Sequence, residues 1–283
     1  MNSFIKAAMA LAILVLPAPL LAQAGTAPGK LVELNGITLH YEERGQGEPL
    51  LLLHGFGRCG PGDWGEIADE LAKDSHVIMP DLRGHGWSTN PSDIFTMRQS
   101  AEDIRALLDT LGLKRVRAMG ISAGAMTLLH IATKYPDRLD AMVLIGGTSY
   151  FPEQARQLLE AIGAAPPRKE DFEMLGRCAS RGEPQVRELM GQFLAFKDSH
   201  EDMNLTPPYL ATIKARTLIV HGDRDEFFPV SIPVEMYRSI PKSQLWIVPN
   251  GDHVPIYGPR TPEFLRITRA FLAAPASSAA RAK

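Results

Sequence analysis

The sequence predicts an α/β fold, with a mostly parallel central sheet, helices on both faces and a small helical insertion. From Leu50 onward, apolar segments of strand length alternate with amphipathic segments of helix length. That order places crossover helices between parallel strands. Between Leu144 and Leu218 the alternation stops and the pattern becomes helical. The 283 residues are 45% hydrophobic and 22% charged, a globular composition with room for one such domain.

The elements are expected in a definite order. An opening hairpin joins Leu31–Leu34 to Ile37–Tyr41 through Asn35-Gly36, a preferred two-residue turn. Five further strands are apolar runs at Leu50–Leu53, Val77–Pro80, Arg115–Met119, Thr217–Val220 and Leu245–Val248. Helices are expected at Met97–Leu111 and Ala123–Lys134, and a last one has Thr261 as its cap and Pro262 in its first turn.

The first 24 residues are expected to be a targeting segment outside the fold. Lys6 precedes the apolar stretch Ala7–Leu16, and Ala22-Gln23-Ala24 matches a small-x-small cleavage site. The apolar run is short for a membrane span, which takes about 20 residues. We therefore expect cleavage after Ala24 and export to the periplasm or the medium, with an uncleaved anchor as the alternative. No stable membrane span is expected once the signal is removed.

Charge and motifs exclude several kinds of partner. The net charge is −2, and removal of Lys6 with the signal leaves 29 basic against 32 acidic residues, or −3. No broad basic face is therefore expected to bind nucleic acid or an anionic membrane. CxxC, HExxH and a Gly-rich dinucleotide loop are all absent from the sequence, so neither a metal nor a cofactor is expected. The sequence carries no signal for an oligomeric state.

Cys59 and Cys178 are the two cysteines of the chain. An oxidising compartment permits a disulfide between them. Two cysteines in a chain of this length are more often independent small packing residues, and that is the expectation here.

Residues Gly120-Ile121-Ser122-Ala123-Gly124 place a serine between an apolar strand and a helix. A serine on so sharp a turn projects its hydroxyl into the open, and only small residues fit two positions before and after it. Gly120 and Gly124 meet that need, and the Ala123 N–H would face a developing oxyanion. The pattern predicts Ser122 as a nucleophile, with a turn serine that bonds its own backbone as the alternative.

Four more motifs follow the expected strands. His54-Gly55-Phe56-Gly57 comes after the strand at 50–53, and a D-x-R-G-x-G turn starts at Asp81. Acidic residues at 223–226 follow the strand at 217–220, and His253 lies behind the last strand. The order serine, acid, histidine resembles the α/β-hydrolase superfamily. The resemblance covers roughly residues 31–273, so residues 25–151 and 214–273 are expected to form the core.

The resemblance implies a catalytic triad of Ser122, Asp225 and His253. The family pattern sets the aspartate three positions after the glycine that ends the strand, which selects Asp225 over Asp223 and Glu226. These two stay open as second and third choices. The resemblance also implies that the backbone N–H groups of Phe56 and Ala123 form the oxyanion hole. His54 and His85 match structural positions of the family, and His221 is interpreted as a packing residue.

The sequence departs from the family pattern at two places. Ala125 stands where the family often has glycine, a small change that should be tolerated. The Arg58–Asp63 stretch has two extra turn formers, Gly60 and Pro61, which puts the geometry of the loop carrying Phe56 in question.

Residues 152–213 resemble the family's helical lid. One face of that insertion is apolar, either lining the site or simply packing: Val186, Leu189, Met190, Phe193 and Leu194. Residues 274–283 are Ala/Ser-rich and are expected to be a disordered tail.

The sequence is therefore interpreted as an exported serine hydrolase that acts on a small-molecule carboxylic ester. Carbon–carbon bond hydrolases share the triad and are the enzymatic alternative, and peptidase and acyltransferase activities also remain. The alternative from another class is a ligand-binding protein that keeps the fold without catalysis.

Overall fold

A computed structural model of the chain describes residues 28–166 and 168–274. The expected signal peptide, its cleavage site and residues 275–283 of the expected tail lie outside the described residues.

Eight strands form one sheet in the order β1-β2-β4-β3-β5-β6-β7-β8. β1 pairs with β2, and β2 with β4, in antiparallel orientation. All other neighbouring strands in the sheet are parallel. The predicted α/β class with a mostly parallel sheet is confirmed. The strand bounds are β1 Lys30–Leu34, β2 Ile37–Arg44, β3 Glu48–Leu53, β4 Ser75–Pro80, β5 Val116–Ile121, β6 Leu139–Ile145, β7 Arg216–Gly222 and β8 Ser243–Val248.

The predicted opening hairpin is present, with Leu34 opposite Ile37. Asn35 and Gly36 both have positive φ, 46° and 75°. Two central residues of positive φ are what a type I′ turn requires, and its twist matches that of the strands.

Helices cover both faces of the sheet. On one face lie α1 (Gly60–Leu71) and α9 (Thr261–Ala273), which bury Trp64 and Phe264 completely. The other face carries α2 (Met97–Thr110), α3 (Ala123–Lys134) and α8 (Ser231–Ser239). The inner strands β3 to β7 bury side chains on both faces, which explains their continuous apolar runs in the sequence.

The start of α9 differs from the prediction. Arg260 is the cap residue, because a short 3₁₀ turn at Gly258–Arg260 runs directly into the helix. The hydroxyl of Thr261 instead donates to the carbonyl of Ile256 at 3.0 Å. Pro262 does lie in the first turn, as predicted.

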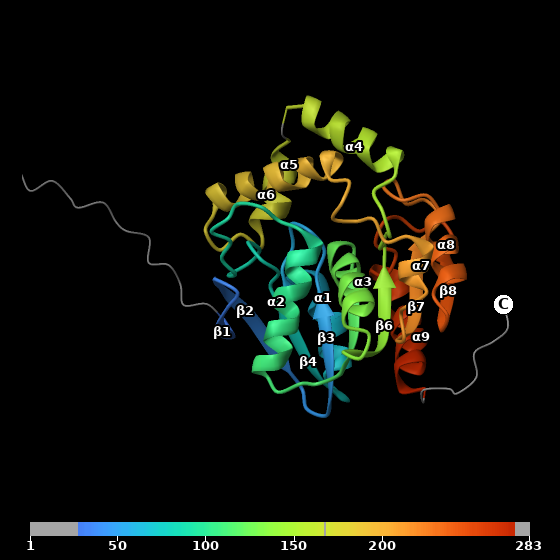
Figure 1. Cartoon of the computed structure of the whole chain (residues 1–283). Coiled ribbons are helices and arrows are strands. Elements are labelled where there is room, and N and C mark those ends of the chain that lie inside the picture. The colour runs from blue at the N-terminus through green and yellow to red at the C-terminus, as the bar shows by residue number, and fades with distance from the viewer. Residues whose placement is uncertain (1–27, 167, 275–283) are drawn as a thin grey trace, which may run out of the picture.

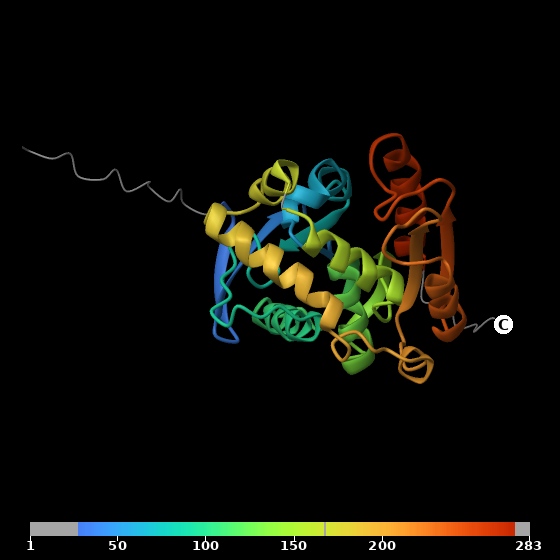
Figure 2. The ribbon, with the colours of Figure 1, turned by 90° about the horizontal axis from the view of Figure 1, so that it is seen from above.

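The segment between β6 and β7 is mainly helical. It forms α4 (Glu153–Ala164), α5 (Lys169–Gly176), α6 (Glu183–Ala195) and the short α7 (Pro207–Leu210). In Figure 1 the first three, here called the cap helices, lie above the carboxyl ends of the strands. Figure 2 shows them crossing over that end of the molecule when it is seen from above.

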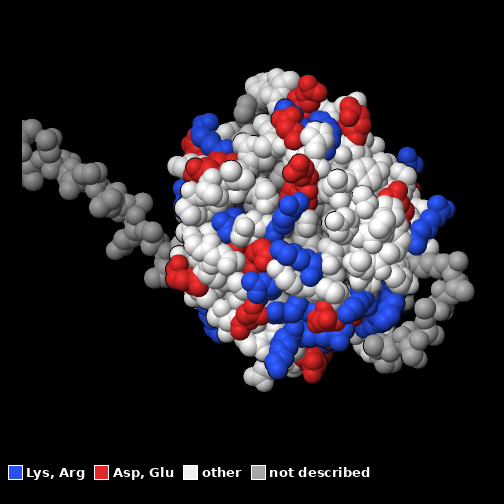
Figure 3. All heavy atoms as spheres, viewed as in Figure 1, with Lys and Arg blue, Asp and Glu red and all other residues white. Residues whose placement is uncertain are grey.

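Charged side chains of both signs are interspersed on the face shown in Figure 3, with Lys and Arg more frequent at the lower edge, away from the cap helices. Across residues 28–166 and 168–274, no helix is both long enough and apolar enough to traverse a bilayer.

Candidate active site

The strand order reverses at β3, because β4 lies on one side of it and β5 on the other. Ligands of open α/β sheets bind at such a reversal, outside the carboxyl ends of the strands. Ser122 follows β5, Asp225 follows β7 and His253 follows β8. All three predicted side chains therefore start from the edge of the sheet where a ligand would bind.

Ser122 occupies the sharp strand-to-helix turn expected from the sequence. Its φ of 49° and ψ of −111° are strained for a residue with a side chain. A Cβ added to Gly120 would lie 2.5 Å from the carbonyl carbon of Gly124, and one added to Gly124 would lie 2.4 Å from the Leu53 oxygen. Both glycines are therefore required by backbone that passes too close for any side chain.

Ala125 is accommodated by a glycine elsewhere in the sequence. A Cβ on Gly147 would lie 2.8 Å from the Cβ of Ala125, closer than real side chains approach. Gly147 thus leaves the space that the methyl group of Ala125 occupies.

The three predicted triad side chains form one hydrogen-bonded relay. His253 Nε2 lies 3.0 Å from Ser122 Oγ, and His253 Nδ1 lies 2.9 Å from Asp225 Oδ2. A carboxylate can only accept, so the Nδ1–H donates to Asp225 and Nε2 is left to accept the serine proton. The histidine side chain is 19% exposed, whereas that of Asp225 is fully buried. The relay is therefore open to a ligand only at its serine end.

Asp225 is held as an acceptor by the backbone after it. Its other oxygen, Oδ1, accepts the N–H groups of Phe227 at 2.8 Å and Phe228 at 3.1 Å. Burial alone would raise the pKa of Asp225, but the hydrogen bond and charge of His253 outweigh burial and hold that pKa below its usual value. Both alternative acids, Asp223 and Glu226, are exposed. The structure therefore brings Asp225, and neither alternative, to the histidine.

His221 lies closer to the relay than the sequence suggested. Its ring is fully buried, and Nε2 contacts both the Phe228 carbonyl at 2.9 Å and Asp225 Oδ2 at 3.5 Å. Burial lowers the pKa of His221, which keeps the ring neutral beside the carboxylate. Its position four residues before Asp225 was the signal available in the sequence.

The loop after β3 presents its backbone to Ser122. Within the described residues, neither the Phe56 N–H nor the Ala123 N–H has a hydrogen-bond acceptor, and both residues line the same cavity as Ser122. Unpaired N–H groups beside a nucleophile can receive a developing oxyanion. This placement fits the predicted oxyanion hole.

Asp63 braces this loop and was not predicted. Its Oδ2 accepts the Gly55 N–H at 2.8 Å, and its Oδ1 pairs with Arg58 Nε at 2.7 Å. Gly60 and Pro61, interpreted from sequence as extra turn formers, are instead the start of α1. Proline in the first turn of a helix was the signal that could have revealed this.

His54 and His85 lie where the resemblance implied a structural role. His54 Nε2 accepts the Leu82 N–H at 2.8 Å, which ties the loop after β3 to the one after β4. His85 is completely buried with its ring 4.7 Å from that of Phe56, and burial lowers the pKa of His85 to about 3.

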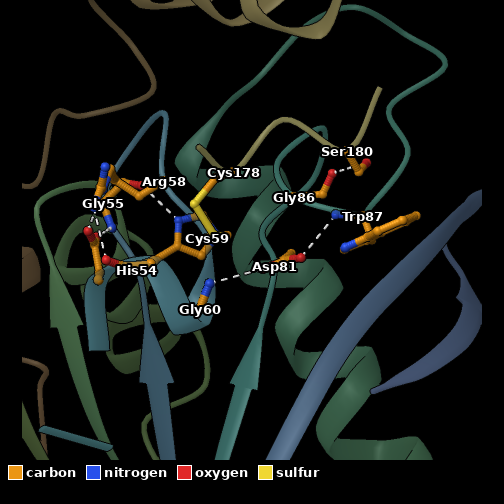
Figure 4. Close-up of a disulfide and its surroundings, with 12 residues drawn as sticks. His54, Gly55, Arg58, Cys59, Gly60, Asp81, Gly86, Trp87, Cys178 and Ser180 are labelled. Carbon is orange, nitrogen blue, oxygen red and sulfur yellow. Dashed lines mark hydrogen bonds and ion pairs between the residues drawn. A yellow bond between two sulfur atoms is a disulfide. The ribbon is translucent and has the colours of Figure 1, made fainter. Parts of the chain in front are cut away.

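A disulfide joins Cys59 to Cys178, so the expectation of two independent cysteines is wrong. The bridge connects the loop after β3 with the turn between α5 and α6 (Figure 4). The sequence could not reveal the pairing, because 119 residues separate the cysteines and only the fold brings their Cα atoms to 5.6 Å.

A cavity of about 1040 Å³ lies over Ser122 and beneath the cap helices. Four of the five apolar residues predicted on one face of the insertion line it, and Val186 is buried without lining it. Aromatic rings from α6, from the 3₁₀ turn after it and from the loops that follow three strands complete its wall: Phe56, Phe151, Phe193, Phe196, Phe227 and Phe228. The cavity therefore suits a large apolar group next to the serine hydroxyl. No set of three or more His, Cys, Asp or Glu side chains in the described part of the chain is placed to hold a metal.

Comparisons with known proteins agree with this arrangement. Residues 48–173 match the profile of a family described as the alpha/beta hydrolase fold. Serine hydrolase BPHL from Homo sapiens is 27% identical over 237 residues, 78% of this chain and 79% of that protein. The 2-hydroxy-6-oxo-6-phenylhexa-2,4-dienoate hydrolase of Comamonas testosteroni is 28% identical over 253 residues, 78% of this chain and 86% of that protein. A thermophilic esterase from Thermogutta terrifontis superposes with a TM-score of 0.68 at 26% identity, over 86% of this chain and 98% of that chain.

Proposed function

Because the chain belongs to the α/β-hydrolase fold superfamily and is a hydrolase of that fold, we propose that it cleaves neutral carboxylic esters through an acyl-enzyme on Ser122. The observation that carries the proposal is the Ser122–His253–Asp225 relay at the floor of an apolar cavity. The esterase among the similar structures adds support.

The proposed reaction follows from this geometry. Ser122 Oγ attacks the ester carbonyl carbon while its proton passes to His253 Nε2, and Asp225 stabilises the resulting imidazolium. The N–H groups of Phe56 and Ala123 receive the carbonyl oxygen as it becomes negative. His253 then returns its proton to the departing alcohol, which leaves the acyl group on Ser122. Water, deprotonated by the same histidine, releases the acid and restores the serine.

The charge of the cavity favours a neutral ester over a dienoate. Among the Lys and Arg side chains of the described residues, only Arg58 and Arg168 line the cavity. Each is already paired with a carboxylate, Asp63 at 2.7 Å and Asp171 at 2.8 Å. A substrate carboxylate would lose water without gaining a free cation, and an unpaired buried charge is costly. The dienoate hydrolases among the relatives nevertheless make carbon–carbon bond cleavage the second candidate.

A matched pair of substrates tests this preference. We expect kcat/KM for p-nitrophenyl hexanoate to exceed that for mono-p-nitrophenyl adipate by at least about tenfold, because a single pocket contact is worth that much or more. The two esters have the same chain length and differ in one terminal carboxylate. For 2-hydroxy-6-oxo-6-phenylhexa-2,4-dienoate we expect turnover below that of the hexanoate. Faster cleavage of the dienoate than of every ester would assign carbon–carbon hydrolysis, and faster cleavage of matched anilides would assign an amidase.

We also propose that the protein is exported. The leader of residues 1–24 has the pattern of a cleavable signal peptide, and the disulfide between Cys59 and Cys178 suits an oxidising compartment. Protein expressed with its own leader in a bacterial host should be recovered from the periplasm or medium with Gly25 as its first residue. N-terminal sequencing and intact mass check this, and a full-length cytoplasmic product would refute it.

A further inference from the structure

We propose that the disulfide between Cys59 and Cys178 positions the active site by holding the loop that carries the Phe56 N–H against the turn between α5 and α6. The inference rests on the proposed function, because Phe56 acts only if an oxyanion forms at Ser122.

The loop is firmly held on the side of β3. Asp63 accepts the Gly55 N–H at 2.8 Å, and the neighbouring ring of His54 is fixed by the Leu82 N–H at 2.8 Å. The next residues are held mainly through the side chain of Arg58, whose Nε pairs with Asp63 at 2.7 Å. Their backbone has less support: the Arg58 N–H reaches the Gly55 carbonyl at 3.3 Å, and Gly57 has a φ of 75°. Phe56 therefore lies between a fixed residue and a more weakly held stretch of backbone.

Support on the other side comes from Asp81. Its Oδ1 accepts the Gly60 N–H and its Oδ2 accepts the Trp87 N–H, both at 3.0 Å (Figure 4). This carboxylate fixes the start of α1 and the turn after β4 in one arrangement. Cys59 lies directly between that fixed helix start and the loop, three residues after Phe56.

The turn that contains Cys178 is anchored to the core as well. Ser180 Oγ donates to the Gly86 carbonyl at 2.5 Å, and Gln185 Nε2 donates to the carbonyls of Gly84 at 2.9 Å and Gly86 at 3.0 Å. These bonds attach the turn between α5 and α6 to the loop after β4. The disulfide is its covalent attachment to the loop after β3, the one that carries Phe56.

Leu175, at the end of α5, presses directly on this loop. A Cβ on Gly57 would lie 2.3 Å from Leu175 Cδ2, and the leucine side chain is buried. The disulfide keeps α5 close enough for this contact. When it is opened, Leu175 can withdraw from Gly57 and the Phe56 N–H loses its fixed position.

Oxyanion donors act only at a fixed distance from the oxyanion, about 2.7–3.1 Å. A displacement of about 1 Å can cost up to about a hundredfold in rate. Because Asp63 still holds Gly55 after the bridge is opened, we expect a partial loss of about tenfold in kcat. Neither cysteine takes part in the hydrogen bonds of the relay, so the relay should be unaffected. Residues of α4 and α6 continue to line the cavity, so most ground-state contacts with the substrate should remain.

The test compares the wild type with Cys59→Ser/Cys178→Ser. For p-nitrophenyl hexanoate we expect kcat to fall about tenfold while KM stays within about twofold. An alkyl trifluoromethyl ketone adds to the serine and places an oxyanion in the hole, so its inhibition constant should weaken by a similar factor. A mere loss of folded protein would lower the apparent kcat without weakening the inhibition constant of the ketone.

Ser180→Ala is the matched control, because it removes another attachment of the same turn and leaves the disulfide intact. Its kcat should stay within about twofold of the wild type. As a second route, folded wild type is reduced with a phosphine well below its unfolding temperature, and the loss should reverse on reoxidation. Circular dichroism accompanies each assay.

Full kcat and full ketone affinity in the folded, bridge-free protein would overturn the proposal. So would an equal loss in Ser180→Ala, or unfolding both of the double variant and of the reduced wild type, because the bridge would then serve the fold alone. A wild type that cleaves no ester and binds no ketone would instead reject the proposed function.

Discussion

Ser122→Ala is expected to lower ester turnover by about a millionfold, to the rate left by binding and the oxyanion donors alone. The hydroxyl is the only group lost, and the acyl-enzyme cannot form without it. The remaining relay between His253 and Asp225 keeps its 2.9 Å contact, so the variant should still bind substrate. Steady-state kinetics on a chromogenic ester, with affinity measured by equilibrium binding, checks both statements.

The substitution should leave the fold intact. Alanine meets the same strained φ of 49° as serine, and Gly120 and Gly124 continue to provide the space for the turn. Circular dichroism and the unfolding temperature serve as controls. A folded, uncontaminated variant that retained even a tenth of the activity would reject Ser122 as the nucleophile.

Asp225→Asn is expected to lower turnover by about ten-thousandfold, because an amide can donate to Nδ1 and favour the wrong imidazole tautomer. Then Nε2 would carry the proton and could no longer accept one from Ser122. The backbone N–H groups of Phe227 and Phe228 still find an acceptor in the amide oxygen, so the turn should persist. Kinetics at a single pH, with circular dichroism, measures the effect.

The chain provides two matched controls for this variant. Asp223→Asn and Glu226→Gln make the same chemical change at exposed side chains of the same turn. Both should retain turnover within about threefold of the wild type, as is usual for surface substitutions. A severe loss in Asp223→Asn beside a mild one in Asp225→Asn would move the acid by two positions and contradict the observed relay.

Local signals predicted much of the fold. The Asn35-Gly36 turn and the apolar runs have short-range causes, namely backbone preference and burial on both faces of a sheet. The helix predicted at Ala123–Lys134 has the observed bounds, because the glycine-flanked serine determines where it starts. Thr261 was misassigned as a cap since the preceding 3₁₀ turn left no periodic pattern to read.

The candidate site was predictable where one short segment sets the geometry. The turn at Ser122 and the position of Asp225 after β7 follow from residues adjacent in sequence. The pairing of Cys59 with Cys178 and the support given by Asp63 depend on how loops meet in space. Such contacts leave no spacing rule in one sequence, and so they could not be predicted.

Site-specific labelling distinguishes an activated serine from a site that only binds a ligand. Folded wild-type protein is treated with a fluorophosphonate, and the adduct is located by intact mass and peptide mapping. We expect one phosphonyl group per chain, on Ser122, and none on Ser122→Ala, because the relay with His253 Nε2 at 3.0 Å activates this hydroxyl alone among the described serines. No adduct on folded protein, or an adduct on another residue, would contradict it and favour a ligand-binding role for the cavity.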